Sequence, residues 1–196
     1  MNLFEREIRL ENDRARLVPF DAVYKDGLRQ IIYDEEITRF GGGLPFRTEQ
    51  DLDRYIEDTC KSRATKQSYP FIVIDKQTGE VAGSTRFGYI IPHNKRLEIG
   101  WTWYGEAYRG TGLNKACKYE LLKFVFEELG YRRVQLSVDI DNVRSQRAVL
   151  KLGATQEGIF RSNYIGADGS SRDDVYFSII HTEWDRIKRE VFTEFA

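Results

Sequence analysis

The stretch with the clearest spacing for ligand chemistry covers residues 108–114, which read Tyr-Arg-Gly-Thr-Gly-Leu-Asn. An apolar run rich in β-branched and aromatic residues precedes it, and an amphipathic helical pattern follows it to residue 129. In the order strand, glycine turn and helix, glycine lets the backbone approach a ligand, and free N–H groups of the first helical turn point at it. The helix dipole favours negative charge there. The stretch therefore indicates a phosphate-binding turn.

Two common phosphate motifs do not fit this turn. The P-loop would need Lys and then Ser or Thr directly after Gly112, where the chain has Leu113 and Asn114. The dinucleotide motif would need a third glycine where the chain has Lys115. On its own, the tetrapeptide 109–112 is more typical of an ordinary turn between a strand and a helix, so its interpretation depends on the rest of the chain.

Motifs further along supply that context. An apolar run at 134–139 is followed by Asn142-x-x-Ser145, by a helical pattern that ends in Lys-Leu-Gly at 151–153, and by Glu-Gly at 157–158. This order resembles the GNAT acetyltransferases, in which a strand, a pyrophosphate loop and a helix precede a second strand and an Asn-x-x-Ser helix. The resemblance covers residues 71–184.

The C-terminal part resembles the RimJ/RimL branch of that family, which acetylates protein N-termini. The residues that carry this likeness are Arg161 to Gly169, Arg172-Asp173, Tyr176 and Glu183-Trp184. The resemblance implies an α+β, GNAT-like fold: a central mixed, mostly antiparallel twisted sheet of about seven strands flanked by helices in three αβα layers.

The implied function is transfer of an acetyl group from acetyl-CoA, as co-substrate, to a primary amine, with a protein or peptide N-terminus as the first acceptor to consider. A small amine, such as a polyamine or an aminoglycoside, is an alternative acceptor. A non-catalytic acetyl-CoA-binding module is a further alternative, because no single residue is an unmistakable catalyst.

The resemblance also implies where the cofactor lies. Its pyrophosphate would bind the backbone of residues 109–114 and the Arg109 side chain, because Ala107 replaces the Gln or Arg that often begins the family's loop. Its pantetheine arm would follow the strand 98–104. The expected cofactor-binding residues are Trp101, Thr102, Trp103, Arg109, Gly110, Thr111, Gly112, Leu113, Asn114, Asn142 and Arg147.

Strand alternation predicts the faces of that strand. It places Ile99, Trp101 and Trp103 on one face, with Glu98, Gly100 and Thr102 on the other. Packing in the core is the alternative role for the two tryptophans.

Acetyl transfer to an amine needs a base for the amine, a donor for the thioester oxygen and help for the departing thiolate. Glu98 is the candidate base, with a surface salt bridge to Lys95 or Arg96 as the alternative. Asp173 is the next candidate for contact with the amine. By its match with the family pattern, Ser145 would hydrogen-bond the thiolate. The tyrosine acid of many family members would fall at Val149, so that version of the mechanism does not fit.

The elements that position these residues are expected within one domain, 1–196. The expected strands cover 8–20 as a hairpin, 71–74, 81–91, 97–104, 132–138, 156–165 and 175–181, and the expected helices cover 22–33, a stretch opened by Thr48 and Asp51, 113–129, 142–152 and 182–192. Asp21 is expected to cap the first helix, with Val23 and Leu28 on its buried face. The three glycines at 41–43 indicate a mobile loop, which the resemblance implies to be a lid over the acceptor; a plain connector is the alternative.

Composition narrows the partners. Lys and Arg number 30 and Asp and Glu 31, so no basic excess points to nucleic acid. The sequence has no apolar stretch long enough to predict a membrane-spanning helix. The chain has only two cysteines, which indicates a reduced, cytoplasmic protein. Its two histidines have no cluster of cysteine or carboxylate ligands near them in the sequence, so no metal site is expected. A homodimer is possible.

Overall fold

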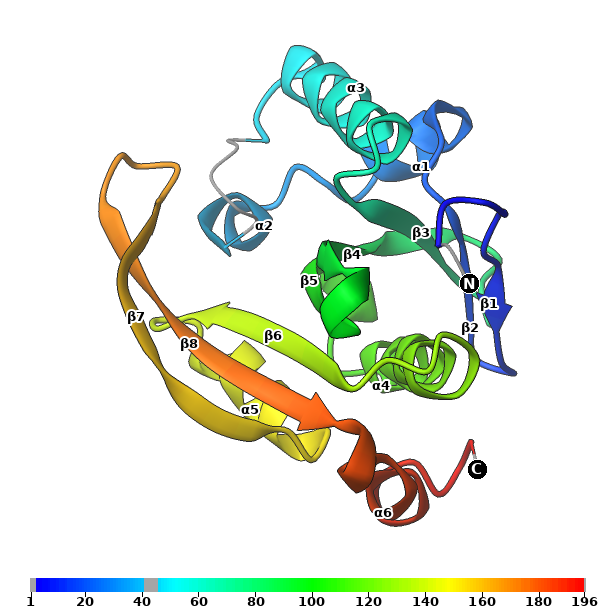
Figure 1. Ribbon diagram of the computed structural model, residues 1–196. Helices are drawn as coiled ribbons and strands as arrows, with labels where there is room; N and C mark the ends of the chain where they lie inside the picture. The colour runs from blue at the N-terminus through cyan, green and yellow to red at the C-terminus, as the bar shows by residue number, and fades with distance from the viewer. Residues whose placement is uncertain (1–2, 41–45, 196) are drawn as a thin grey trace.

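A mixed sheet of eight strands runs through the residues that the computed structural model describes, 3–40 and 46–195 (Figure 1). Neighbouring strands are antiparallel except for the parallel pair β5 and β6. The sheet order is β1-β2-β3-β4-β5-β6-β8-β7. The strands are β1 (Leu10–Glu11), β2 (Ala15–Pro19), β3 (Tyr69–Asp75), β4 (Val81–Ile91), β5 (Arg96–Tyr104), β6 (Arg133–Asp139), β7 (Thr155–Ile165) and β8 (Ser171–Ile180). The α+β prediction is confirmed.

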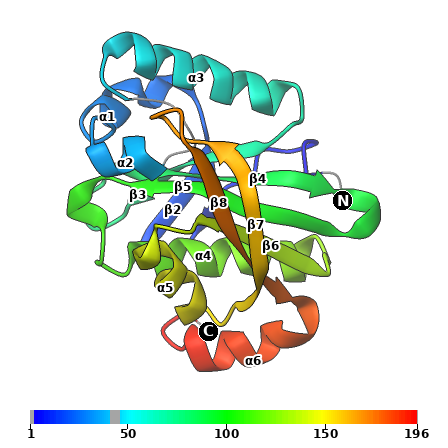
Figure 2. The same cartoon turned by 90° about the vertical axis from the view of Figure 1, so that its left-hand side faces the viewer.

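Helices cover both faces of this sheet. Figures 1 and 2 show α1 and α3 on one side, and α4 and α6 on the other. The α-helices are α1 (Lys25–Arg29), α2 (Glu35–Phe40), α3 (Glu49–Ala64), α4 (Leu113–Lys123), α5 (Val143–Lys151) and α6 (His181–Val191). The 3₁₀ turns are η1 (Ala22–Tyr24), η2 (Pro92–Asn94) and η3 (Glu106–Tyr108), and η4 (Phe124–Glu128) is a turn of π-helix that extends α4.

Each face of the sheet has its own hydrophobic core. On the α4 and α6 face, strand residues such as Phe87 and Phe177 pack with Leu121 of α4 and Ile187 of α6. On the other face, buried residues of α1, of the turn after it and of α3 pack against β2, β3 and β5. These are Leu28, Ile32, Leu52, Tyr55, Ile56, Val18, Ile72 and Trp103. Two apolar interfaces with one sheet between them make the three layers that were expected.

Several element ends follow their local sequence signals. Asp21 Oδ1 accepts a hydrogen bond from Val23 N at 2.9 Å, as a helix cap does. Thr48 and Asp51 form a reciprocal capping box at the start of α3. Gly153 follows α5 with a φ of +86°, a conformation that glycine adopts without strain.

The first helical segment differs from its prediction. The chain forms the 3₁₀ turn η1 and then the short α1, and Val23, expected on the buried face, is 77% exposed. A 3₁₀ turn has three residues per turn, so it does not continue the face of the α-helix behind it. Leu28 and Ile32 are fully buried as expected. The glycine run at 41–43 lies outside the described residues. Within those residues no helix is both long and apolar enough to span a membrane.

Candidate active site

Strands β5 and β6 pair over only three residues and then separate. The parallel register joins Arg96 to Arg133, Leu97 to Val134 and Glu98 to Gln135. β6 pairs with β8 along its whole length, and, in the part of the chain that the structure describes, β5 continues to Tyr104 paired with β4 alone. After the split, the backbone of β5 therefore has no strand partner on the β6 side among the described residues, as at the edge of a sheet. Such an edge can take an extended ligand that supplies the missing hydrogen bonds.

A β-bulge in β5 lies beside this split. Ser84 pairs with Trp103 and Arg86 with Gly100, so two residues of β5 oppose Thr85 alone. Trp101 in the bulge has a φ of +49°, which is uncommon for a bulky residue. Strain of this kind is retained where the surroundings impose it, and it is common at functional sites.

The bulge makes the predicted grouping of strand faces wrong. Ile99 packs in the core beneath α4, whereas Trp103 lies in the core beneath α3, where its Nε1 donates to Tyr55 Oη at 3.2 Å. The extra residue reverses the alternation from Trp101 onward, because side chains in a strand have a period of two. Core packing is the observed role of Trp103. Thr102 turns toward α4, where its hydroxyl accepts a hydrogen bond from Lys118.

Glu98 is buried at the point where the two strands separate. It is 2% exposed and accepts hydrogen bonds from Gln135 Nε2 at 2.8 Å and Ser137 Oγ at 2.9 Å. Burial raises the pKa of the Glu98 carboxyl and the charge of Asp174 adds to this, while the two hydrogen bonds act in the opposite direction. The salt bridge with Lys95 or Arg96 that sequence alone allowed does not form. A carboxylate with a raised pKa and neutral neighbours suits a general base.

Partly exposed aromatic side chains lie on the same face of the sheet as Glu98. Trp101 lies over Gly88, where a Cβ would come within 2.3 Å of the indole, and it packs against Tyr89 with ring centroids 5.6 Å apart. On β7 and β8, Phe160 stacks on Tyr176 at 4.1 Å. We call these four residues, Tyr89, Trp101, Phe160 and Tyr176, the aromatic rim. Burial raises the pKa of Tyr176, and the charges of Glu98 and Tyr89 raise it further, which indicates that the rim and the carboxylate share one face.

The structure does not bring Asp173 to this face. Along β8, Val175 and Phe177 point into the core beneath α4, and alternation puts Asp173 on that same side. Its carboxylate accepts from Ser162 N at 2.7 Å. The neighbouring Asp174 faces Glu98 instead, and burial raises its pKa, although Asn163 Nδ2 donates to it at 2.7 Å.

The phosphate-binding turn has the backbone that its sequence predicts. Gly110 and Gly112 have φ values of +74° and +87°, and Gly112 is the N-cap residue of α4, which it leaves without a side-chain cap. The N–H of Leu113, the first residue of α4, makes one long hydrogen bond to Thr111 Oγ1 at 3.5 Å, so the N–H groups of Asn114 and Lys115 remain open to a ligand. Thr111 Oγ1 donates to Tyr108 O at 2.9 Å, which ties the turn back on itself.

Arg109 points toward α2. Its guanidinium donates to Asp34 Oδ2 at 2.8 Å and Glu36 Oε2 at 2.9 Å, and its Nε donates to Tyr104 O at 3.0 Å. Arg144 of α5 also donates to Glu36, at 2.9 Å. The side-chain contact with pyrophosphate that we expected of Arg109 would require it to leave these carboxylates, so the backbone N–H groups are the better-placed donors.

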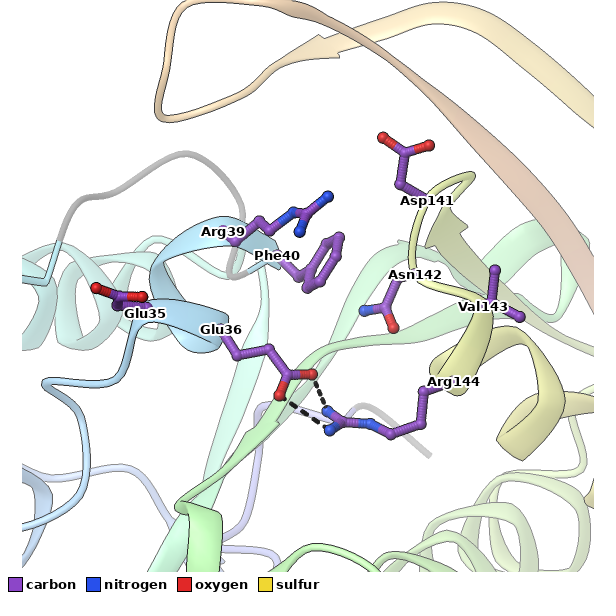
Figure 3. Close-up of a pocket in the computed structure, with 8 residues that line it drawn as sticks. All are labelled: Glu35, Glu36, Arg39, Phe40, Asp141, Asn142, Val143 and Arg144. Carbon is purple, nitrogen blue, oxygen red and sulfur yellow. Dashed lines mark hydrogen bonds and ion pairs between the residues drawn. The ribbon is translucent and has the colours of Figure 1, made fainter.

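A cavity of about 470 Å³ separates α2 from the start of α5 (Figure 3). Its walls are Glu35, Glu36, Arg39, Phe40, Asp141, Asn142, Val143 and Arg144. Asn142 caps α5, since its Oδ1 accepts from Ser145 N at 3.1 Å, and the Ser145 hydroxyl is left free of any side-chain or backbone bond among those found in the described residues. Arg147 is exposed. The cofactor roles of these residues stay predictions.

Four residues of the site were not predicted from the sequence. They are Gln135, Ser137, Asp174 and Lys118. The polar positions that alternate with Val134, Leu136 and Val138 could have revealed the first two, because they mark the opposite face of a buried strand. Asp174 could not be chosen over Asp173 without the register of β8. Lys118 lies within an apolar helical stripe and had no separate signal.

Comparison with known proteins identifies relatives for nearly the whole chain. A family model described as the acetyltransferase (GNAT) domain matches residues 14–155. The uncharacterised N-acetyltransferase p20 of Bacillus licheniformis is 27% identical over 175 residues, 89% of this chain and 97% of that protein. YdaF of Bacillus subtilis, a candidate ribosomal N-acetyltransferase, is 28% identical over 107 residues, 55% of this chain and 57% of that protein. A GCN5-related N-acetyltransferase from Brucella melitensis superposes with a TM-score of 0.86 at 27% identity, covering 96% of this chain and 85% of the other.

Proposed function

The chain belongs to the GNAT family of acetyltransferases, and we propose that it transfers the acetyl group of acetyl-CoA to the α-amine of a protein or peptide N-terminus. The observation that carries the proposal is the buried Glu98 beside the split between β5 and β6. A base and an open strand edge next to each other can align an amine with a thioester bound along that edge. Such alignment supplies much of the acceleration in a two-substrate transfer.

Two backbone features suit the cofactor. The N–H groups of Asn114 and Lys115 at the start of α4 offer donors to the diphosphate, and the edge of β5 offers hydrogen-bonding groups to the amides of the pantetheine arm. Both lie at the same end of β5, since the phosphate-binding turn follows Tyr104 closely. No metal takes part in this proposal.

Proton transfer in the proposed reaction starts at Glu98. The ammonium form of the acceptor gives a proton to the carboxylate, directly or through a water molecule, and the neutral amine then attacks the thioester carbon. The tetrahedral intermediate expels the CoA thiolate, and Ser145 at the start of α5 is the proposed hydrogen-bond donor to that sulfur. The amide nitrogen loses its remaining extra proton, and the thiolate takes one up.

The acceptor face supports a cationic amine on a larger molecule. Two buried carboxylates, Glu98 and Asp174, lie beneath an aromatic rim that is wide and partly open, with Tyr89 61% and Phe160 55% exposed. Carboxylates favour an ammonium group, and aromatic faces favour both cations and apolar side chains. The name of YdaF and the resemblance to the RimJ/RimL branch favour a protein N-terminus among such amines.

A small cationic amine is the second candidate acceptor. The cavity between α2 and α5 has the volume of small-ligand sites, and it contains Glu35 and Asp141. An acceptor screen that follows release of CoA separates the candidates. We expect turnover with unblocked peptides to exceed that with polyamines or aminoglycosides. The reverse order would transfer the proposal to the small amine, and absence of turnover with every class would contradict both.

A further inference from the structure

Lys118 is a buried lysine on the face of α4 that points at the bulged part of β5. The residue is 4% exposed, and its Nζ donates to Thr102 Oγ1 at 2.8 Å. The hydroxyls of Thr102 and Thr85 are 2.7 Å apart, so the hydrogen-bond chain continues to β4. An ammonium group carries three donors, and this contact uses one of them.

No negative group compensates the charge of Lys118 within the described residues. The ionisable group found to act on it is the neighbouring Cys117, whose pKa burial raises to about 12, so the thiol stays neutral. On β5, Tyr104 is also neutral, because burial raises its pKa. The group of β5 that Nζ contacts is the neutral hydroxyl of Thr102, which in turn bonds the hydroxyl of Thr85 on β4. A buried ammonium without a counter-ion is costly, so a lysine here needs another reason.

Asn114 adds a second unsatisfied group on the same face of α4. It precedes Lys118 by four residues, which places the two side chains one above the other. The Asn114 Oδ1 atom is buried and lacks a hydrogen-bond partner. Buried polar atoms are normally paired, so an unpaired acceptor on the same helix face as an ammonium without a counter-ion indicates a ligand that is missing from both.

The position of this pair fits the proposed cofactor. A long side chain on a helix points back toward the N-terminus, so the Lys118 ammonium lies toward the first turn of α4. Its partner Thr102 belongs to the part of β5 that has separated from β6. The two groups therefore lie between the turn proposed for the diphosphate and the edge proposed for the pantetheine arm.

We propose that Lys118 and Asn114 form a further part of the cofactor site, in which the ammonium binds an oxygen of the diphosphate and the Asn114 amide oxygen accepts a hydrogen bond from the pantetheine arm. This inference rests on the proposed use of acetyl-CoA. It assigns to α4 two side chains in addition to its backbone N–H groups.

A consequence is that cofactor binding takes up protons. Burial lowers the pKa of Lys118 to about 8 in the free protein, so near pH 8 the amine is half protonated. A diphosphate beside it raises that pKa, because an opposite charge favours the ammonium form. Binding at pH 8 then takes up about half a proton, and affinity decreases as the pH rises from 8 toward about 10, near the usual pKa of lysine.

Calorimetric titration of acetyl-CoA into three proteins tests this inference. They are the wild type, Lys118→Met and the control Lys123→Met, which removes a lysine from the far end of the same helix. Each is titrated at pH 8 in two buffers with different ionisation enthalpies. We expect Lys118→Met to bind about 10- to 100-fold more weakly, the range of a charge-assisted hydrogen bond, and to lose the proton uptake. Lys123→Met should match the wild type in affinity for acetyl-CoA and in proton uptake.

Thermal unfolding separates binding from support of the fold. Lys118→Met removes an uncompensated buried charge, so its melting temperature should equal or exceed that of the wild type. A lower melting temperature with unchanged affinity would show that Lys118 only supports the bulge, and would overturn the inference. The pH dependence of wild-type affinity tests it without any substitution, and constant affinity from pH 8 to about 10 would also overturn it.

Two further measurements distinguish failure of this inference from failure of the proposed function. With 3′-dephospho-CoA, which keeps the diphosphate, Lys118→Met should weaken binding by the same factor as with acetyl-CoA. Loss of that factor would assign Lys118 to the 3′-phosphate and contradict the proposed contact. If the wild type binds neither cofactor, the proposed function itself fails, whereas tight binding that Lys118→Met leaves unchanged refutes this inference alone.

Discussion

At the scale of single residues, the environment of Glu98 decides what the site can do. The carboxylate has lost nearly all contact with water, and its two hydrogen-bond donors, Gln135 and Ser137, are neutral. Gly100 carries no side chain at a position where a Cβ would lie 3.0 Å from Glu98 Oε1. The glycine leaves space beside the carboxylate on the side of the split. The raised pKa makes this carboxylate a better proton acceptor than an exposed glutamate, as a general base requires.

Glu98→Gln tests this role by keeping the shape of the side chain and removing its basicity. We expect the rate to fall about a hundredfold or more, the range that general bases supply. The raised pKa of Glu98 means that the wild-type rate is lost as the pH falls through that pKa, and this acidic limb should disappear in the variant.

Glu120→Gln is a matched control. Glu120 is also a buried glutamate with a pKa raised by burial, but it lies on α4 and accepts from Asn12. Its pH–rate profile should follow the wild type. A normal profile for Glu98→Gln would exclude Glu98 as the base and direct attention to Asp174.

Ser145→Ala tests the group proposed to meet the thiolate. The wild-type hydroxyl lies at the start of α5, whose N-terminus Asn142 caps, and the substitution leaves that cap in place because the bond uses the backbone N of Ser145. We expect kcat to fall, by about a hundredfold at most, with little change in acceptor KM, since the lost interaction forms only as the thiolate departs. Steady-state kinetics that show a raised acceptor KM and an unchanged kcat would place Ser145 at the acceptor.

At the scale of elements, the bulge in β5 and the turn before α4 organise the site. The sequence contains both, but it predicts them unequally. Gly110 and Gly112 predict a turn with positive φ, and both residues have positive φ in the structure. The bulge at Trp101 has no comparable signal, because Trp-Thr-Trp is also a regular strand sequence and the extra residue is defined by its partner, Thr85. The faces of β5 were therefore assigned wrongly from Trp101 onward, while those before it were right.

Gly112→Val tests the turn as a phosphate site. A Cβ at Gly112 would meet no neighbouring atom. The substitution therefore acts in two other ways: valine is strained at a φ of +87°, and its branched side chain covers the N–H groups at the start of α4. Gly79→Val is the control, since Gly79 has a φ of +78° and equally open surroundings in the turn between β3 and β4. Both variants should lose a similar amount of stability, measured by denaturant unfolding.

Calorimetry with acetyl-CoA should then distinguish the two variants. We expect Gly112→Val to lose affinity and Gly79→Val to keep it. Equal affinity of both folded variants would mean that the diphosphate does not bind at this turn.

At the scale of the whole molecule, the site forms where separate parts of the fold meet. Glu98 comes from β5, Asp174 and Tyr176 from β8, and the proposed cofactor contacts from α4 and α5. The order of strands and helices was predictable, because hydrophobic periodicity and caps mark each element. The residues that approach Glu98 from β8 were not, since they depend on a register that joins Ser137 to Tyr176 across a long sequence separation. A single domain and a homodimer remain predictions.

The most direct test of this account is to locate the acetyl group on a product peptide. A peptide with a free N-terminus and an internal lysine is incubated with acetyl-CoA and either the wild type or Glu98→Gln, and tandem mass spectrometry finds the modified amine. We expect the wild type to acetylate the α-amine, and Glu98→Gln to form about a hundredfold less of the same product in the same time. Acetylation of the lysine alone, or equal product from both proteins, would contradict the central claim.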